Sequence, residues 1–489
     1  MQIFNNYRTV FDRGVSDINS RALMLRHEKT GARIFVLSND DDNKVFYIGF
    51  RTPPADSSGM PHIIEHSVLC GSEKYPVKDP FVELCKSSLN TFLNAMTYGD
   101  KTLYPCASRN DADFKNLMDV YLDAVFHPAI LKQPLIYKQE GWSYKLESPE
   151  DDLEYNGVVY NEMKGALSSP EQVMEEVIVS SLFPQSPYGV NSGGDPAEIV
   201  EHSYDEFIAF YKKYYHPSNS YIYLYGNMDI AERLEYLDRE YLSHYEYKQV
   251  DSEIPLQAPF KETSYVTEYY PVEDAEEEKE NTYLSYNFVC GTNLNHEEFV
   301  AMQMIQYALF DTQGAPVKQR FLDEGMCKDV LSLYDNGILQ PYVSIVLKNA
   351  EEKDRDRFLS IFEEEIKKAV KEGINKKSLE ASLSNIRFKY LEADFDGYPR
   401  GLIYGLSSMD SWLYRDEEPL LHIESLQTFD NLKKYIETDY YEKLLAKYYL
   451  NNPHASVVVM VPKAGLASEK DEALKAKLKA YKDSLSEAE

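Results

Sequence analysis

The sequence is poor in several features that would place it in other classes of protein. No apolar run approaches the roughly 18 residues that a helix needs to cross a bilayer, so a membrane-spanning protein is not expected. Basic residues are scarce, at 51 Lys and Arg against 81 Asp and Glu, and the net charge is −30. This balance argues against a general nucleic-acid binder, because phosphate contacts require clustered Lys and Arg.

Cysteine is also rare, with five residues that are widely spaced and form no Cys-x-x-Cys pair. An odd, scattered set favours free thiols in a reducing compartment over a disulfide framework. The first residues have neither a basic n-region nor an apolar h-region, so they do not resemble a secretory signal. Arg8 and Arg13 would suit a transit peptide, but Asp12 and Asp17 would not. We therefore expect the protein to be cytoplasmic, and we regard the mitochondrial matrix as the less favoured alternative.

The composition provides ample material for a folded core. Apolar residues make up 43% and aromatic residues 13% of the 489 residues, which excludes global disorder and suggests two or three domains. Apolar β-rich runs at 22–37 and 44–50, joined by a polar Asn/Asp cluster, predict an antiparallel hairpin. Helical spacing predicts helices at 61–70, 111–131 and 203–215.

The second half of the chain echoes the first. The helix–turn–strand sequence FIAFYKKYYHPSNSYIYLYG at 207–226 has a counterpart in YEKLLAKYYLNNPHASVVVMV at 441–461. Likewise, KVFYIGF at 44–50 is echoed by YLSYNFVCG at 283–291. We therefore predict an α+β fold of two homologous domains, each a mainly antiparallel β-sheet packed with helices.

Composition shifts along the chain suggest where these domains end. We predict a first domain at 1–248, an acidic linker with an entry strand at 249–280, and a second domain at 281–465. The spacing of apolar residues predicts a charged helix with a narrow apolar stripe at 466–489, and we expect it to begin a further element or to dock onto a second polypeptide.

The segment His62-Ile63-Ile64-Glu65-His66 is the sharpest chemical signal in the sequence. On a helix, positions i and i+4 lie on one face, so the imidazoles of His62 and His66 can bind one Zn²⁺. Glu65 can then take a proton from the attacking water as a general base. A catalytic zinc site needs a third protein ligand, and spacing alone does not choose among the many carboxylates. The alternative is a pair of surface histidines beside a glutamate.

Longer motifs carry a resemblance to a known family. They are TPPADSSGMPHIIEHSVLCGSEKYPVKDPFVEL (52–84), SSLNTFLNAMTYGDKTLYPCASRNDADF (87–114), GVVYNEMKGAL (157–167), SPYGVNSGGDP (186–196) and YYHPSNSYIYLYG (214–226). Over essentially its whole length, the chain resembles the presequence-protease and falcilysin branch of the inverzincin zinc metallopeptidases. Insulysin and pitrilysin are more distant relatives.

The resemblance implies a site and a reaction. Glu162 would be the third zinc ligand beside His62 and His66, with Glu65 as the general base and Zn²⁺ as the cofactor. The expected activity is that of a zinc metalloendopeptidase, which hydrolyses short unstructured peptides with a zinc-activated water. The alternative for Glu162 is an ordinary exposed helical carboxylate.

The resemblance also implies a substrate-binding segment at Asn94 and Ala95. In the family, this segment is an exposed edge strand to which peptide substrates add as one more strand. Main-chain hydrogen bonds then hold any extended peptide, whatever its side chains, which explains a preference for unfolded substrates. The alternative is an ordinary core strand in which Asn94 lies in a turn.

Two departures from the family pattern bear on function. The insulysin and pitrilysin branches carry an acidic residue seven positions before the ligand glutamate, where this chain has Tyr155. Full-length relatives are about twice as long, and their second half follows a connecting helical hairpin and helps to bind substrate. The chain therefore resembles an N-terminal half-clamshell, with 466–489 as the start of the hairpin and a C-terminal half as a missing partner. The alternative function is a zinc-bearing but non-catalytic half that is active only with that partner.

The second copy of the repeat has lost the metal motif. Its corresponding segment reads GTNLNHEEFVAM, in which His296, Glu297 and Glu298 do not have ligand spacing. We expect ordinary residues at the start of a helix, with Asn295 or Thr292 as the cap.

Overall fold

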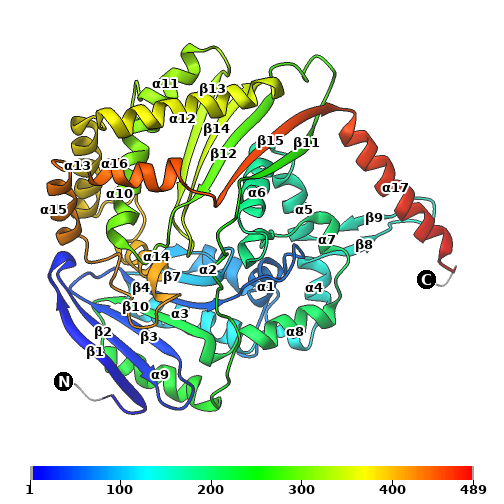
Figure 1. Cartoon of the computed structure of the whole chain (residues 1–489). Helices are drawn as coiled ribbons and strands as arrows, with labels where there is room; N and C mark the ends of the chain where they lie inside the picture. The colour runs from blue at the N-terminus through cyan, green and yellow to red at the C-terminus, as the bar shows by residue number, and fades with distance from the viewer. Residues whose placement is uncertain (1–3, 487–489) are drawn as a thin grey trace.

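Two β-sheets with packed helices make up the chain, and one sheet lies above the other in Figure 1. The computed structural model describes residues 4–486. The lower sheet contains β1 (Tyr7–Val15), β2 (Ser20–His27), β3 (Arg33–Ser38), β4 (Lys44–Arg51), β5 (Asn90–Leu93), β6 (Met96–Thr97), β7 (Lys101–Ser108) and β10 (Ser220–Gly226). The upper sheet contains β11 (Ser264–Val272), β12 (Thr282–Val289), β13 (Asp329–Asp335), β14 (Tyr342–Ala350) and β15 (Ala455–Ala464).

The two sheets share one topology. Five strands run in the order β3-β10-β4-β7-β5 in the lower sheet and β11-β15-β12-β14-β13 in the upper one. β10 is parallel to β3 and antiparallel to β4, and β15 is likewise parallel to β11 and antiparallel to β12. The remaining neighbours in both sheets are antiparallel. The prediction of an α+β fold with two homologous, mainly antiparallel sheets is confirmed.

The predicted hairpin between 22–37 and 44–50 is wrong. β3 pairs with β2, and β10 lies between β3 and β4, so the two runs are not neighbours. The polar cluster wraps around the end of β10: Asp41 accepts hydrogen bonds from the phenol of Tyr225 and from the amide of Asn227. Local turn chemistry favours a hairpin, but it carries no information about a strand far along the chain that pairs with both runs.

The three predicted helices are present as α1 (Met60–Val68), α3 (Asp111–Phe126) and α8 (Tyr204–Tyr214). A capping box of Ser203 and Glu206 begins α8, and α3 ends before Pro128. The lower half also contains α2 (Pro80–Ser87), α4 (Pro134–Glu140), the small sheet of β8 (Ser143–Lys145) and β9 (Glu154–Asn156), α5 (Val158–Ala166), α6 (Pro170–Leu182), α7 (Pro196–Ile199) and α9 (Ile230–Glu240).

The upper half is rich in helices as well. They are α10 (His296–Gln306), α11 (Pro316–Asp323), α12 (Arg355–Glu372), α13 (Lys376–Glu392), α14 (Arg400–Trp412), α15 (Leu426–Tyr435), α16 (Tyr440–Leu445) and α17 (Leu466–Ser484). Among residues 4–486, no helix is both long and apolar enough to cross a membrane.

Each half sends one helix to the other half's sheet. From the first half, α6 packs Met174, Ile178 and Leu182 into a core with strands β14 and β15. From the second half, α14 covers the lower sheet, and its Gly401 and Gly405 lie where any Cβ would collide with tyrosine rings of that sheet. The halves are therefore interlocked, and the division at 1–248, 249–280, 281–465 and 466–489 stays a proposal.

Helix α10 is the counterpart of α1, since each follows the corresponding strand of its sheet. The side chain of Asn295 accepts a hydrogen bond from the amide of Glu298 at 3.3 Å. Of the two N-caps predicted from the sequence, Asn295 and Thr292, the structure thus has Asn295. At the other end of the chain, α17 stands at the side of the molecule in Figure 1. There Tyr481 stacks on Tyr144 with ring centroids 4.7 Å apart.

Candidate metal centre

Helix α1 presents both motif histidines on one face. It begins after Gly59, whose φ of 68° suits glycine, and Pro61 stands in its first turn. The rings of His62 and His66 have centroids 4.8 Å apart and planes at 89°. From α5, Oε2 of Glu162 lies 3.8 Å from Nε2 of His62 and 3.7 Å from Nε2 of His66. The structure thus brings together the three side chains that we predicted as metal ligands.

The second ring nitrogen of each histidine faces a partner from another element. Nδ1 of His62 lies 3.0 Å from the carbonyl oxygen of Gly193, in the loop before α7. Asn191 holds this loop, because its Oδ1 accepts a hydrogen bond from the amide of Gly193 at 2.9 Å. Nδ1 of His66 faces Oε2 of Glu140 at 3.5 Å. In both rings Nε2 is left for the ligand position, as second partners of this kind achieve in metal sites.

Sequence reasoning missed Glu140 and Gly193. Neither residue lies at a helical spacing from the His-x-x-Glu-His motif. Glu140 contacts α1 because α4 packs on it, and Gly193 does so because the loop before α7 folds back onto it. Tyr155, which stands where more distant relatives carry an acid, stacks instead on Tyr144 with centroids 5.5 Å apart. The carboxylate that faces Nδ1 of His66 is instead that of Glu140, on α4.

Negative charge gathers around the two imidazoles. Burial alone would lower the pKa of His66, but the contact with Glu140 and the charges of Glu65 and Glu162 outweigh burial, so this pKa is raised. Burial raises the pKa of Glu140, yet the hydrogen bonds from His66 and Gln139 bring it below its ordinary value. This arrangement favours a cation between the imidazoles and Glu162.

The donor set fits zinc. The three ligand atoms all lie within 4.8 Å of one another, and two nitrogens with one carboxylate oxygen form a common catalytic zinc set. Two atoms bonded at about 2.1 Å to a tetrahedral zinc lie about 3.4 Å apart. The N···O separations of 3.7 and 3.8 Å are slightly longer than this. The side chain of Glu162 is 53% exposed, so the site opens toward solvent on that side.

Glu65 lies on α1 between the two histidines and is buried, with 8% of its surface exposed. Its charge is one of several that raise the pKa of Tyr98, after burial as the largest cause. Helix α1, which carries this carboxylate, packs beside β6. The buried carboxylate thus lies beside the two histidines, on a helix at the edge of the sheet.

Asn94 and Ala95 lie between β5 and β6, at the outer edge of the lower sheet. Within the described range 4–486, both strands pair only with β7, and α1 packs beside β6. The amide of Asn94 donates to the carbonyl of Pro105 at 3.2 Å, and its own carbonyl accepts from the phenol of Tyr121 at 3.0 Å. Asn94 thus uses its main chain inside the fold and exposes its side chain.

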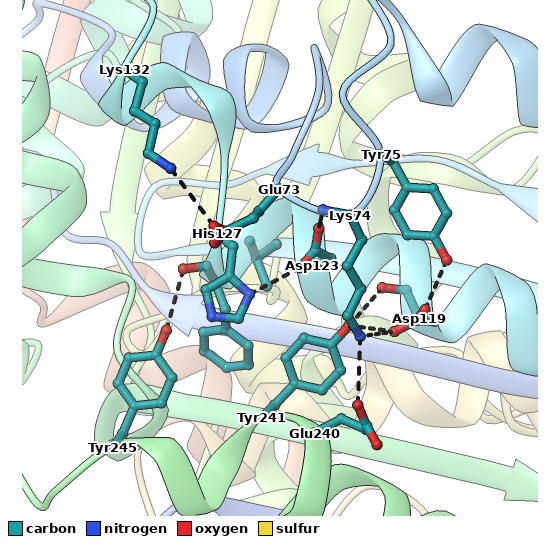
Figure 2. A network of polar contacts seen from close by, with 12 residues as sticks. Glu73, Lys74, Tyr75, Asp119, Asp123, His127, Lys132, Glu240, Tyr241 and Tyr245 are labelled. Carbon is teal, nitrogen blue, oxygen red and sulfur yellow. Dashed lines mark hydrogen bonds and ion pairs between the residues drawn. The ribbon is translucent and has the colours of Figure 1, made fainter.

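A polar network anchors the loop that follows α1, as Figure 2 shows. The carboxylate of Asp119, on α3, accepts hydrogen bonds from four side chains: Lys74, Tyr75, Tyr236 and Tyr241. Asp123 accepts from the amide of Lys74 at 2.7 Å and contacts the imidazole of His127 at 2.9 Å. The loop at the end of the motif helix is therefore fixed to α3.

Comparison with known proteins places the chain in a family. The model of insulinase, peptidase family M16, matches residues 45–183, and that of the peptidase M16 inactive domain matches residues 202–386. The chain is 45% identical over 485 residues to Protein HypA of Clostridium perfringens, covering 99% of the chain and 50% of that protein. It is 39% identical over 475 residues to presequence protease 1 of Arabidopsis thaliana, covering 95% and 44% respectively. The chain thus spans about half the length of these relatives.

Solved structures show the same fold. A protease from Helicobacter pylori aligns with a TM-score of 0.66 at 12% identity, covering 93% of this chain and 99% of that one. Pitrilysin aligns with a TM-score of 0.62 at 15% identity, covering 94% of this chain and 47% of that one. These structures show the fold, and together with the two family models they define the class as that of the M16-type peptidases.

The chain belongs to peptidase family M16, on its presequence-protease branch. The resemblance that the sequence motifs predicted is confirmed.

Proposed function

We propose that the chain is a zinc metalloendopeptidase half that hydrolyses short, unstructured peptides. One observation carries the proposal: Nε2 of His62, Nε2 of His66 and Oε2 of Glu162 face a common point. The names of the relatives support a peptidase, and the donor set supports zinc as its cofactor.

The chemistry follows from the residues around that point. When bound, zinc would lower the pKa of a water molecule and polarise the scissile carbonyl. Glu65 would accept the proton that the attacking water loses, and would then deliver it to the leaving amide nitrogen. Its place beside the ligands on α1 allows one carboxylate to perform both transfers.

The edge at β6 supplies a way to hold the substrate. An extended peptide would add beside the segment of Asn94 and Ala95, held by main-chain hydrogen bonds other than those of the two Asn94 groups that the fold already uses, and by the exposed side-chain carboxamide of Asn94. This mode requires a free strand, so it selects unfolded peptides over folded proteins.

Two substitutions test the proposal. Glu65→Gln should retain zinc and lose peptide cleavage, because Gln has no basic carboxylate. Glu162→Ala should lower the zinc content after dialysis, because two histidines alone bind zinc more weakly. Unchanged turnover of a quenched peptide by Glu65→Gln, or unchanged zinc content in Glu162→Ala, would contradict the respective role.

A second candidate function is a zinc-bearing half that becomes active only with a C-terminal partner half. Two observations favour it: the chain spans about half of its relatives, and the side of the site at Glu162 is open to solvent. Assaying the 489-residue chain on a quenched peptide, with and without the C-terminal half of a relative, separates the two candidates. Activity of the chain alone favours the first, and activity only in the mixture favours the second. For either function we propose a cytoplasmic location.

A further inference from the structure

Glu140 is a buried carboxylate in an unfavourable place. It is the last residue of α4 and is 6% exposed. The carboxyl end of a helix carries the negative end of its dipole, so a carboxylate there is repelled rather than stabilised. Burial adds a desolvation cost to this repulsion. Partners of Glu140 must offset both effects.

The partners of Glu140 point to the metal ligands. Its Oε1 accepts a hydrogen bond from Nε2 of Gln139 at 2.8 Å, and its Oε2 faces Nδ1 of His66 at 3.5 Å. Within residues 4–486, His66 is the one basic side chain that forms an ion-pair contact with it. The thiol of Cys70 is a further hydrogen-bond neighbour of Glu140, and no surface cation among the described residues contacts it, so its one charged partner is the imidazole of His66.

His62 provides the comparison within the same site. Its Nδ1 is held by a main-chain carbonyl, that of Gly193, so its partner has no charge and cannot be removed by substitution. The corresponding partner of His66 is a side chain. An imidazole whose Nδ1–H is held by an acceptor keeps the lone pair of Nε2 for the metal and becomes a better donor.

We propose that Glu140 is a positioning residue for the zinc ligand His66, fixing the tautomer and orientation in which Nε2 faces Glu162. The inference rests on the proposed zinc site, so its test must separate the two.

The experiment measures the zinc affinity of the metal-free 489-residue chain by competition with a chromophoric chelator. Wild type should bind one zinc, and His66→Ala should lose this binding; equal binding by both would refute the zinc site itself. Glu140→Gln, which keeps the size of the side chain, should weaken zinc binding about 10- to 100-fold. Glu73→Gln, an exposed glutamate on the loop after α1, is the matched control and should bind like wild type.

A second measurement distinguishes positioning from folding. The thermal midpoint of metal-free Glu140→Gln should match that of metal-free wild type within a few degrees. Glu140→Asp, which keeps the charge, should bind zinc more tightly than Glu140→Gln. Wild-type affinity in Glu140→Gln would overturn the inference, provided that His66→Ala has lost zinc. So would a loss of affinity accompanied by an equally large loss of stability in the metal-free chain.

Discussion

Two buried histidines should make the upper half of the molecule sensitive to acid. His296 begins α10 and His422 precedes α15; each is 9% exposed, and their ring centroids are 5.0 Å apart. Hydroxyls at Ser425 and Thr428 contact the ring of His296, at 3.3 and 3.4 Å. Neither nitrogen of His422 has a hydrogen-bond partner of good geometry among residues 4–486. Protonating either ring would place a charge where little solvates it.

Burial lowers the pKa of His296 to about 4. Burial, followed by the neighbouring His296, lowers that of His422 to about 3, and a backbone contact at Asn293 opposes the shift as the smallest cause. Both values lie below the ordinary 6.5, so the folded state binds fewer protons than the unfolded chain. Stability is then complete above pH 6.5 and is lost as the pH falls toward the folded values. Between pH 7.5 and 5.5, linkage predicts a loss of about 1.3 kcal/mol for each histidine, or about 2.6 kcal/mol for the pair.

The substitution His422→Phe separates the contribution of His422 to this pH dependence from that of His296. Phenylalanine fills a similar space, does not titrate, and would stack on Phe299, whose ring centroid lies 4.4 Å from that of His422. The variant should therefore retain about 1.3 of the 2.6 kcal/mol of pH dependence. The absolute stability at pH 7.5 should not fall, because two unpaired nitrogens are removed.

Hydrogen exchange of the α10 amides at pH 7.5 and 5.5, corrected for intrinsic exchange rates, measures how the local stability of this region depends on pH. The measurement does not require two-state unfolding. His244→Phe is the control, since that imidazole is exposed and should contribute little. An identical pH dependence in wild type and His422→Phe would refute the reasoning.

Two further predictions concern the support of the site. Gly59→Ala should cost at least 1–2 kcal/mol and reduce zinc content, because φ is +68° and a Cβ would lie 2.6 Å from the carbonyl oxygen of Gly193. Urea unfolding compares the free energy of unfolding of this variant with that of Gly314→Ala, where φ is +72° and no atom lies within 4 Å of the Cβ position. Equal losses of stability in the two variants would mean that the close approach of Gly59 to Gly193 is unimportant. Asp119→Asn should destabilise the chain by about 1–3 kcal/mol, because four donors lose a charged acceptor. Thermal unfolding against Asp205→Asn, an exposed control, measures this, and an unchanged midpoint would contradict the structural role of the network.

Patterns within short stretches of sequence predicted the helices and the repeat, but not which distant strands pair. Helical spacing identified α1, α3 and α8, and the echo between 207–226 and 441–461 identified the repeat. Pairing between distant strands was beyond such reasoning, which is why β10 between β3 and β4 was missed. In the site, the motif named His62 and His66, and family resemblance was needed for Glu162. Glu140 and Gly193 have no sequence signal, because they reach α1 only through the packing of α4 and a loop.

The same distinction explains why, among residues 4–486, the candidate set of metal ligands is found in the first copy of the repeat and not in the second. In the first copy, the segment between α3 and α8 supplies Glu162, which faces both Nε2 atoms, and the two Nδ1 partners Glu140 and Gly193. In the second copy, the equivalent segment between α12 and α16 forms α13, α14 and α15, and α14 leaves to cover the lower sheet. Placing His-x-x-Glu-His in α10 would thus provide two histidines without a counterpart of Glu162, Glu140 and Gly193 beside them. The candidate metal site therefore depends on the segment between α3 and α8 as much as on the motif helix α1, whereas the equivalent segment of the second copy supplies α14, which covers the lower sheet.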